Sequence, residues 1–156
     1  MFARYYTYVE FPFEEVSKLL LQPSPQWLAG LDGDSGDELL ARVGVRVGRI
    51  PIYKHVRLQP EHGRMLRPIK VIVPLAWKTS GGPPIFPEMH GQLEAEPFGS
   101  ARTQLTLSAN YEPPLGALGE AIDRALLYRL GDATLHDFMA RVVDNVRLDL
   151  ELQHKT

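Results

Sequence analysis

The sequence contains no cysteine, and this absence excludes several kinds of chemistry. Without thiols the chain has no disulfide framework, no thiolate nucleophile, no iron–sulfur cluster and none of the common zinc sites. The phosphate-binding loop, the dinucleotide fingerprint and the nucleophile elbow of hydrolases are also missing. The nearest approach to a metal-binding pair is Asp132 with His136, and their spacing is more typical of a solvated helix surface. We therefore expect neither a metal nor a cofactor.

The chain also lacks long apolar runs and an excess of charge of one sign. No apolar run approaches the roughly 20 residues that a membrane-spanning helix needs. Residues 1–6 lack the basic segment and apolar core of a secretion signal, so we expect a cytoplasmic protein with no stable membrane insertion. Seventeen basic residues are scattered among nineteen acidic ones and form no basic stripe. Nucleic acid is therefore not an expected partner.

The apolar residues that are present suffice for one core and are arranged as strands. At 156 residues, 44% hydrophobic and 23% charged, the chain is typical of one globular domain, which we expect over residues 1–156. Between Glu38 and Tyr111, apolar and polar side chains alternate with a period of two, which predicts five consecutive antiparallel strands. Four hairpins, turning at 48–49, 60–63, 79–83 and 97–101, would place apolar residues opposite one another. The predicted pairs include Val47 with Ile50, Leu58 with Met65, Val73 with Met89, and Leu93 with Leu105.

Two short helices are predicted between a first strand and this meander. The first strand, near Ala3–Phe11, is expected to pair with the last strand of the meander. A short helix follows over residues 13–20, because Pro12 and two acidic residues suit a helix start and Pro23 ends it. A second short turn of helix is expected over residues 25–28.

A long helical pattern runs over residues 115–150. In its second half large apolar residues share one face, whereas the same face in the first half carries Ala117, Ala121 and Tyr128 and is mostly small. One interpretation is a continuous helix whose trimmed first half leaves volume beside a cavity.

The other interpretation is a break at Gly131, with Asp132 or Thr134 capping a second helix. The pattern favours the continuous helix. In either case the predicted class is α+β: a curved antiparallel sheet of six or seven strands around a long C-terminal helix, with two short helices after the first strand. A sheet that wraps around a helix leaves space between the two, and this space suits an apolar guest.

Two short motifs mark the starts of the expected helices: Val9–Val16, which reads Val-Glu-Phe-Pro-Phe-Glu-Glu-Val, and Pro113–Gly119 followed by Asp123. With the order of elements, these motifs resemble the START-like (SRPBCC) superfamily, which includes birch-pollen-allergen-like proteins and polyketide cyclases. The resemblance covers nearly the whole chain and implies a helix-grip barrel with an internal cavity for a lipid, sterol, polyketide or similar hydrophobic molecule. That superfamily shares no catalytic residue, so none is transferred here. A seventh strand, frequent in these proteins, would require Met65–Trp77 to be split near Pro68.

Two cations, Lys54 and Arg67, fall on inward positions of strands that are otherwise apolar. The predicted hairpin makes them neighbours. A buried cation must be paired, so together they would bind a carboxylate or enolate at one end of a hydrophobic ligand. The alternative is that both side chains extend to the rim of the sheet or pair with carboxylates of the protein.

Other inward residues are candidates to line the cavity. Tyr5, Tyr111 and Tyr128 would present hydroxyl groups to a ligand, or else they are core residues with a solvated hydroxyl. The expected apolar lining consists of Val71, Trp77, Met89 and Gly91 from the sheet, with Ala117 and Ala121 from the helix.

Together these features favour binding or carriage of a small hydrophobic molecule between sheet and C-terminal helix. The first alternative is a polyketide aromatase/cyclase-type enzyme that would use tyrosine or arginine groups in the same cavity. Against it, the inward positions are poor in acids, bases and histidines. The second alternative is a dimeric interaction module, because Leu118, Ile122 and Leu126 need cover that a homodimer would provide.

Overall fold

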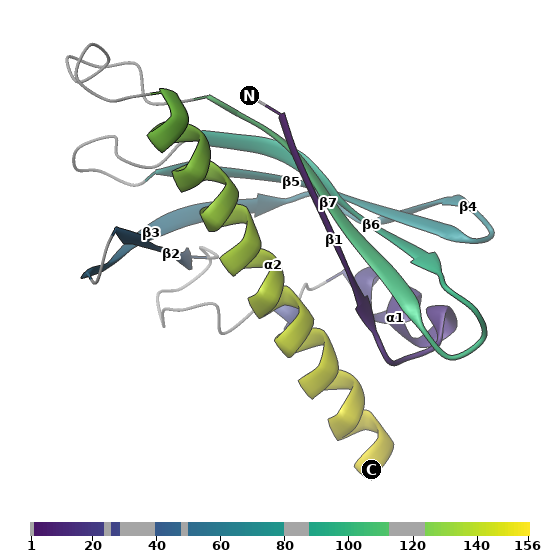
Figure 1. Cartoon of the computed structure of the whole chain (residues 1–156). Helices are drawn as coiled ribbons and strands as arrows, with labels where there is room; N and C mark the ends of the chain where they lie inside the picture. The colour runs from purple at the N-terminus through teal and green to yellow at the C-terminus, as the bar shows by residue number, and fades with distance from the viewer. Residues whose placement is uncertain (1, 24–25, 29–39, 48–49, 80–87, 113–123) are drawn as a thin grey trace.

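The computed structural model describes residues 2–23, 26–28, 40–47, 50–79, 88–112 and 124–156, with side chains for 2–23, 27–28, 60–78, 88–110, 129 and 132–156. The strands form one antiparallel sheet in the order β1-β7-β6-β5-β3-β2, and β4 pairs with β5. Figure 1 shows α2 lying across one face of this twisted sheet. The predicted α+β class, with an antiparallel sheet and a C-terminal helix, is confirmed. The elements are β1 (Phe2–Val9), α1 (Phe13–Leu20), the 3-10 helix η1 (Gln26–Leu28), β2 (Leu40–Val47), β3 (Ile50–Pro60), β4 (Arg64–Arg67), β5 (Lys70–Thr79), β6 (Glu88–Pro97), β7 (Thr103–Glu112) and α2 (Arg124–Lys155).

Alternate residues of each strand face the core, as the sequence predicts. In β1, Ala3 and Val9 are buried, whereas 59% of Tyr6 is exposed. The predicted pairing of the first strand with the last is confirmed, because β1 pairs antiparallel with β7 over its whole length. The predicted register of β2 with β3 is confirmed as well, with Val47 opposite Ile50.

The other three predicted registers are wrong, each by an even number of residues. Because side chains alternate with a period of two, an even shift leaves each side chain on its predicted face. Apolar patterning therefore determines the face of a strand, while the turns determine its register. The observed partners are Trp77 for Leu58, Leu93 for Val73 and Leu107 for Leu93, in place of Met65, Met89 and Leu105.

One of these shifts arises because the chain does not reverse at residues 60–63. Instead β3 pairs with the second half of β5, and β4 continues in the same direction and pairs with the first residues of β5. The chain reverses only after β4, at Pro68–Ile69. The segment Met65–Trp77 is thus divided, which is the alternative that the sequence left open.

A second shift arises at the loop between β6 and β7, which spans residues 98–102 rather than 97–101. The Phe98 N–H donates a hydrogen bond to the Arg102 carbonyl at 2.9 Å. Gly99 takes a φ of 73°, which favours glycine in this loop. The third predicted turn, at 79–83, lies almost entirely outside the described residues.

α1 packs its apolar side against the inner face of the sheet. The helix begins after Pro12, whose carbonyl accepts a hydrogen bond from the Val16 N–H at 3.2 Å. Val16, Leu19 and Leu20 are buried in the same core cluster as the inward residues of the sheet. The neighbouring residues Phe13, Ser17 and Leu21 of this region form part of a groove.

α2 runs without a break through Gly131, which confirms the continuous interpretation from Arg124 onward. Residues 115–123 lie outside the described part. The backbone of α2 comes close to the two edge strands, β1 and β2, so the helix bridges the curved sheet and side chains fill the distance to the middle strands. The predicted face of large apolar residues in the second half of the helix is buried, and it contains Leu135, Met139, Val142, Val143 and Val146, together with Phe138.

An ion-pair cluster lies on the outer face of the sheet. The Lys70 Nζ lies 2.7 Å from Glu94 Oε2 and 3.2 Å from Glu96 Oε1, and the Gln92 amide also donates to Glu94. Burial alone would raise the pKa of Glu94, but hydrogen bonds from Lys70 and Gln92 and the charges of Lys70 and Arg4 outweigh it and lower that pKa. The hydrogen bond to Glu94 raises the pKa of Lys70, despite partial burial.

Replacing Lys70 with methionine should lower the free energy of unfolding by about 1–3 kcal/mol at neutral pH, because Glu94, only 8% exposed, loses its charged partner. A carboxyl group whose pKa is lowered on folding stabilises the protein above its unfolded-state pKa, and this contribution disappears as the pH falls through the folded-state pKa. The difference in unfolding free energy between the wild type and Lys70→Met should therefore shrink as the pH falls below 4.5, the ordinary pKa of a glutamate carboxyl.

Urea denaturation at neutral and acidic pH measures this difference. The matched control is Lys78→Met, an exposed lysine of the same strand, which should change stability by less than about 0.5 kcal/mol. Equal losses for the two variants, or a difference that does not depend on pH, would contradict the assigned role of Lys70.

Candidate functional site

The inner face of the sheet and the buried stripe of α2 enclose an apolar interior. At the described positions of this interior there is no carboxylate, imidazole, guanidinium or ammonium group. The hydroxyl groups of Tyr5, Thr103 and Thr134 are among its few polar groups. An interior of this composition suits an apolar guest better than acid–base chemistry.

Three large residues meet in the middle of the interior. Trp77 of β5 lies opposite Met89 of β6, and the ring of Phe138 from α2 meets the Trp77 ring edge-on at a centroid distance of 5.2 Å. All three are at most 2% exposed. Protein side chains therefore fill the space between sheet and helix at this point, and a guest would have to lie beside this cluster.

Tyr5 lies at the edge of the interior, where it is half-buried. Its ring contacts the exposed His136 of α2 edge-on, at a centroid distance of 4.7 Å. This aromatic pair joins β1 to α2, and it places an imidazole beside the one phenol among the predicted site residues whose side chain is described.

The other predicted sheet residues do not gather around Trp77. Val71 is buried six residues earlier in β5, opposite Ala95, and six residues of strand span about 20 Å. Gly91 lies opposite Leu75 and not Val71, and a Cβ on Gly91 would lie 2.8 Å from Ala109 Cα. Gly91 therefore admits the close approach of β7, whereas the sequence predicted it to line the cavity.

The predicted pairing of Lys54 with Arg67 is wrong. Arg67 is exposed at the end of β4, beside the turn at Pro68–Ile69, and its backbone partner is Lys70. Lys54 lies in β3 opposite Val43 of β2, and β3 and β4 run in the same direction against β5. With the reversal at Pro68–Ile69, the two cations lie on successive strands and do not face each other. Arg67 is therefore not an anchor for a ligand in the interior.

The remaining predicted site residues lie outside the described side chains and stay predictions. They are Lys54, Tyr111, Ala117, Ala121 and Tyr128.

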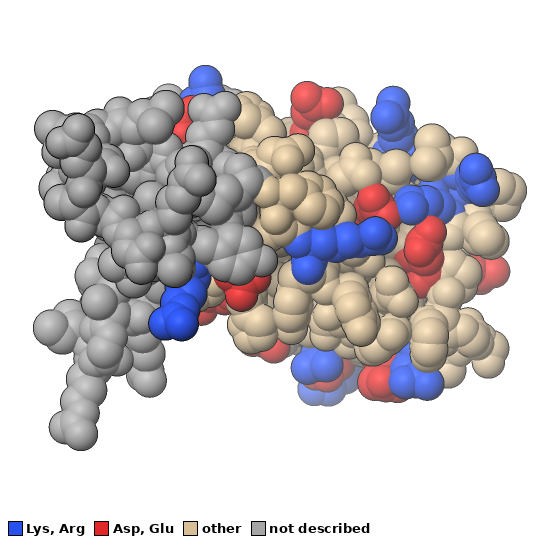
Figure 2. All heavy atoms as spheres, turned by 45° about the horizontal axis from the view of Figure 1, so that its top comes forward, with Lys and Arg blue, Asp and Glu red and all other residues tan. Residues whose placement is uncertain are grey.

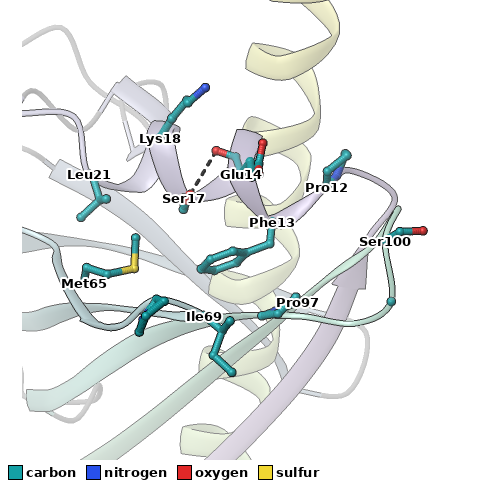
Figure 3. A pocket seen from close by; sticks show the side chains of 12 residues that line it. Pro12, Phe13, Glu14, Ser17, Lys18, Leu21, Met65, Ile69, Pro97 and Ser100 are labelled. Atoms are coloured by element: carbon teal, nitrogen blue, oxygen red, sulfur yellow. Dashed lines mark hydrogen bonds between the residues drawn. The ribbon is translucent and has the colours of Figure 1, made fainter.

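A second, open site lies outside the interior. It is a groove of about 740 Å³ between α1, the β4–β5 hairpin and the β6–β7 loop. Figure 3 shows Phe13 of α1 pointing into the groove above Met65 and Ile69, and Glu14 and Lys18 of the same helix also line it. The walls are mainly apolar, and the volume falls within the range of small-molecule pockets.

The groove was not predicted, because the apolar alternation places Met65 and Ile69 on inward positions of a single strand. They are 45% and 60% exposed. A signal was available: in the segment 64–70 apolar residues occupy both odd and even positions around Pro68, which a strand with one buried face does not show.

Other kinds of site find no support in the described part of the chain. No three His, Asp or Glu side chains come together there as a metal site. None of the helices described is long and apolar enough to cross a membrane. Figure 2 shows Lys and Arg side chains interspersed with Asp and Glu over the described atoms of the face in view, without a continuous basic stripe.

No protein-family model matches the sequence, and no curated protein is similar to it in sequence. Solved structures are similar in fold. A conserved protein from Geobacillus kaustophilus matches with a TM-score of 0.57 at 16% identity, over 94% of this chain and 95% of that one. A Thermus thermophilus protein matches with a TM-score of 0.55 at 15% identity, over 96% and 99%. The Zhui aromatase/cyclase from a Streptomyces species matches with a TM-score of 0.54 at 13% identity, over 97% and 93%.

At identities this low the likeness is one of fold. The chain has a START-like (SRPBCC) fold, and the resemblance drawn from the sequence is confirmed at that level.

Proposed function

We propose that the chain binds and carries a small hydrophobic molecule between the sheet and the long helix, on the side of Trp77 and Phe138 toward the helix N-terminus. The observation that carries the proposal is the absence of charged groups from the described part of the inner face, beneath a helix that bridges both edge strands. A curved sheet bridged in this way stands away from the helix in its middle, and whatever fills the gap must be apolar.

The ligand of this proposal is mostly apolar and has at most one polar end. Tyr5, Tyr111 and Tyr128 are the proposed hydrogen-bond donors, and Lys54 is the one proposed cation, because Arg67 is exposed. A single cation that faces an apolar cavity would favour a ligand with a carboxylate or an enolate, which would pair with it.

An aromatase/cyclase-type enzyme is the second candidate, which the likeness in fold to the Streptomyces enzyme favours. Such an enzyme must move protons at a substrate carbonyl. Among described side chains the only group suited to this is Tyr5 beside His136, at the edge of the interior. Loss of turnover of a poly-keto substrate in Tyr5→Phe would support the enzyme over the carrier. The homodimer proposed as a third possibility would use residues 118–126, whose side chains lie outside the described part.

Filling the proposed cavity should weaken binding without unfolding the protein. Replacing Ala121 with tryptophan should weaken the affinity for N-phenyl-1-naphthylamine, a neutral fluorescent probe, by about tenfold or more, because the probe loses the apolar contacts of the cavity. Fluorescence titration measures the affinity, and native mass spectrometry of the protein from its own source would show whether a natural ligand is retained.

The matched control is Ala140→Trp, since Ala140 is an exposed alanine of the same helix. It should leave probe affinity unchanged. Equal affinities for the wild type and Ala121→Trp, with both proteins folded by circular dichroism, would contradict a ligand site beside the first half of the helix.

A further inference from the structure

Exposed apolar side chains are concentrated around the groove. Four of the eight large hydrophobic residues exposed in the described part of the chain lie on the two turns that border it: Met65, Leu66 and Ile69 on the β4–β5 hairpin and Phe98 on the β6–β7 loop. Met65 and Ile69 line the groove itself. Their exposed fractions range from 43% to 60%. Such a concentration at one end of a molecule marks an interaction surface, because scattered single exposures are the usual pattern.

The β4–β5 hairpin, which carries three of these residues, stands out from the body of the sheet. β4 pairs with β5 outside the main strand order, and all four of its residues are exposed. Figure 1 shows this hairpin extending beyond the other strands on the side away from the start of α2. The apolar side chains therefore sit on two neighbouring turns and do not form a flat patch.

The charged residues of the hairpin itself are basic. The segment 64–70, Arg-Met-Leu-Arg-Pro-Ile-Lys, contains no acidic residue, and Arg64 and Arg67 are exposed. On the other turn, the guanidinium of Arg102 lies 5.0 Å from the Phe98 ring centre. Of the acids nearby, Glu94 and Glu96 bind Lys70, Glu14 of α1 lines the groove, and the exposed Glu61 precedes β4. The hairpin itself thus carries two exposed arginines and no acidic residue, although the whole chain carries a formal charge of −2.

We propose that the β4–β5 hairpin and the β6–β7 loop dock on an anionic lipid bilayer surface. Met65, Leu66, Ile69 and Phe98 enter the boundary between headgroups and acyl chains, while Arg64 and Arg67 bind lipid phosphate and carboxylate groups. Apolar side chains on turns, flanked by arginines, suit a fluid interface that accommodates each side chain separately. Both contributions are needed, because one weak membrane signal alone gives only marginal, reversible binding. This docking is independent of whether the interior holds a ligand.

The test is co-sedimentation of the full chain with vesicles of phosphatidylcholine, alone or with about 30% phosphatidylserine, a content that sets a negative surface potential. The wild type should partition onto the anionic vesicles and less onto the neutral ones, and added salt should weaken the binding. Two variants, Arg64→Gln/Arg67→Gln and Met65→Ser/Leu66→Ser/Ile69→Ser, should each lower the partition coefficient roughly tenfold.

Matched controls come from α2. Leu148→Ser/Leu152→Ser removes two leucines that are each 55% exposed, and Arg129→Gln/Arg147→Gln removes two exposed arginines. Both should bind vesicles like the wild type, with folding of every variant checked by circular dichroism. Absence of binding to anionic vesicles would overturn the proposal, as would equal losses in the hairpin and control variants. A self-associating wild type that the hairpin variants make monomeric would overturn it too, because the surface would then bind a second copy.

Discussion

Replacing Phe138 with alanine is expected to lower the free energy of unfolding by about 3–5 kcal/mol, the range for truncating a buried aromatic ring. Phe138 is 2% exposed, and its ring meets Trp77 at 5.2 Å across the gap between α2 and β5. The loss should be large because the backbone of α2 lies near the edge strands and cannot move in to close the hole. Urea denaturation measures it, and the melting temperature should fall by roughly 10 °C.

The matched control is Leu148→Ala, because Leu148 lies on the same helix and is 55% exposed. Its effect should stay within about 0.5 kcal/mol. If the Phe138 variant loses no more than this control, the interior beside Trp77 is not a closed core, and the proposed ligand would then lie at Phe138 itself. A large loss of stability in Phe138→Ala would instead mean that the proposed ligand lies closer to the start of α2.

The strand faces could be predicted from the sequence because burial repeats every second residue. Trp77, Met89 and Val71 are buried as expected, although three of the four predicted registers are wrong. Apolar alternation looks the same after a shift of two residues, so it cannot choose between registers that differ by an even number. The choice rests on the turns, and the decisive one at Pro68–Ile69 lies inside what reads as a single strand.

The candidate site was harder to predict because it depends on those turns. Lys54 and Arg67 face each other only if the chain reverses at 60–63, and the actual reversal carries Arg67 to an exposed hairpin. The same displacement creates the groove, since it brings Met65 and Ile69 opposite Phe13 of α1. Composition identified an apolar interior correctly. A polar group that binds a ligand depends on the position of one or two residues, and a single wrongly predicted turn changes that position.

Gly91 should tolerate no side chain. A Cβ at this position would overlap the Ser108 carbonyl oxygen and lie 2.8 Å from Ala109 Cα, and both are backbone atoms of the adjacent strand β7. Relief would require β6 and β7 to separate in the middle of the sheet, so Gly91→Ala is expected to lower the free energy of unfolding by about 3 kcal/mol. Chemical denaturation measures the loss.

Gly99 provides the control because its backbone conformation, and not a close contact, favours glycine. A Cβ there meets nothing within 4 Å, but the φ of 73° is left-handed, so Gly99→Ala should lower stability by only about 1 kcal/mol. Asparagine tolerates left-handed backbone and should recover most of the loss at Gly99, whereas Gly91→Asn should be at least as unstable as Gly91→Ala. Recovery by asparagine at both positions would mean that β6 and β7 are less closely apposed than the structure has them, and Gly91 would again be open to the approach of a ligand.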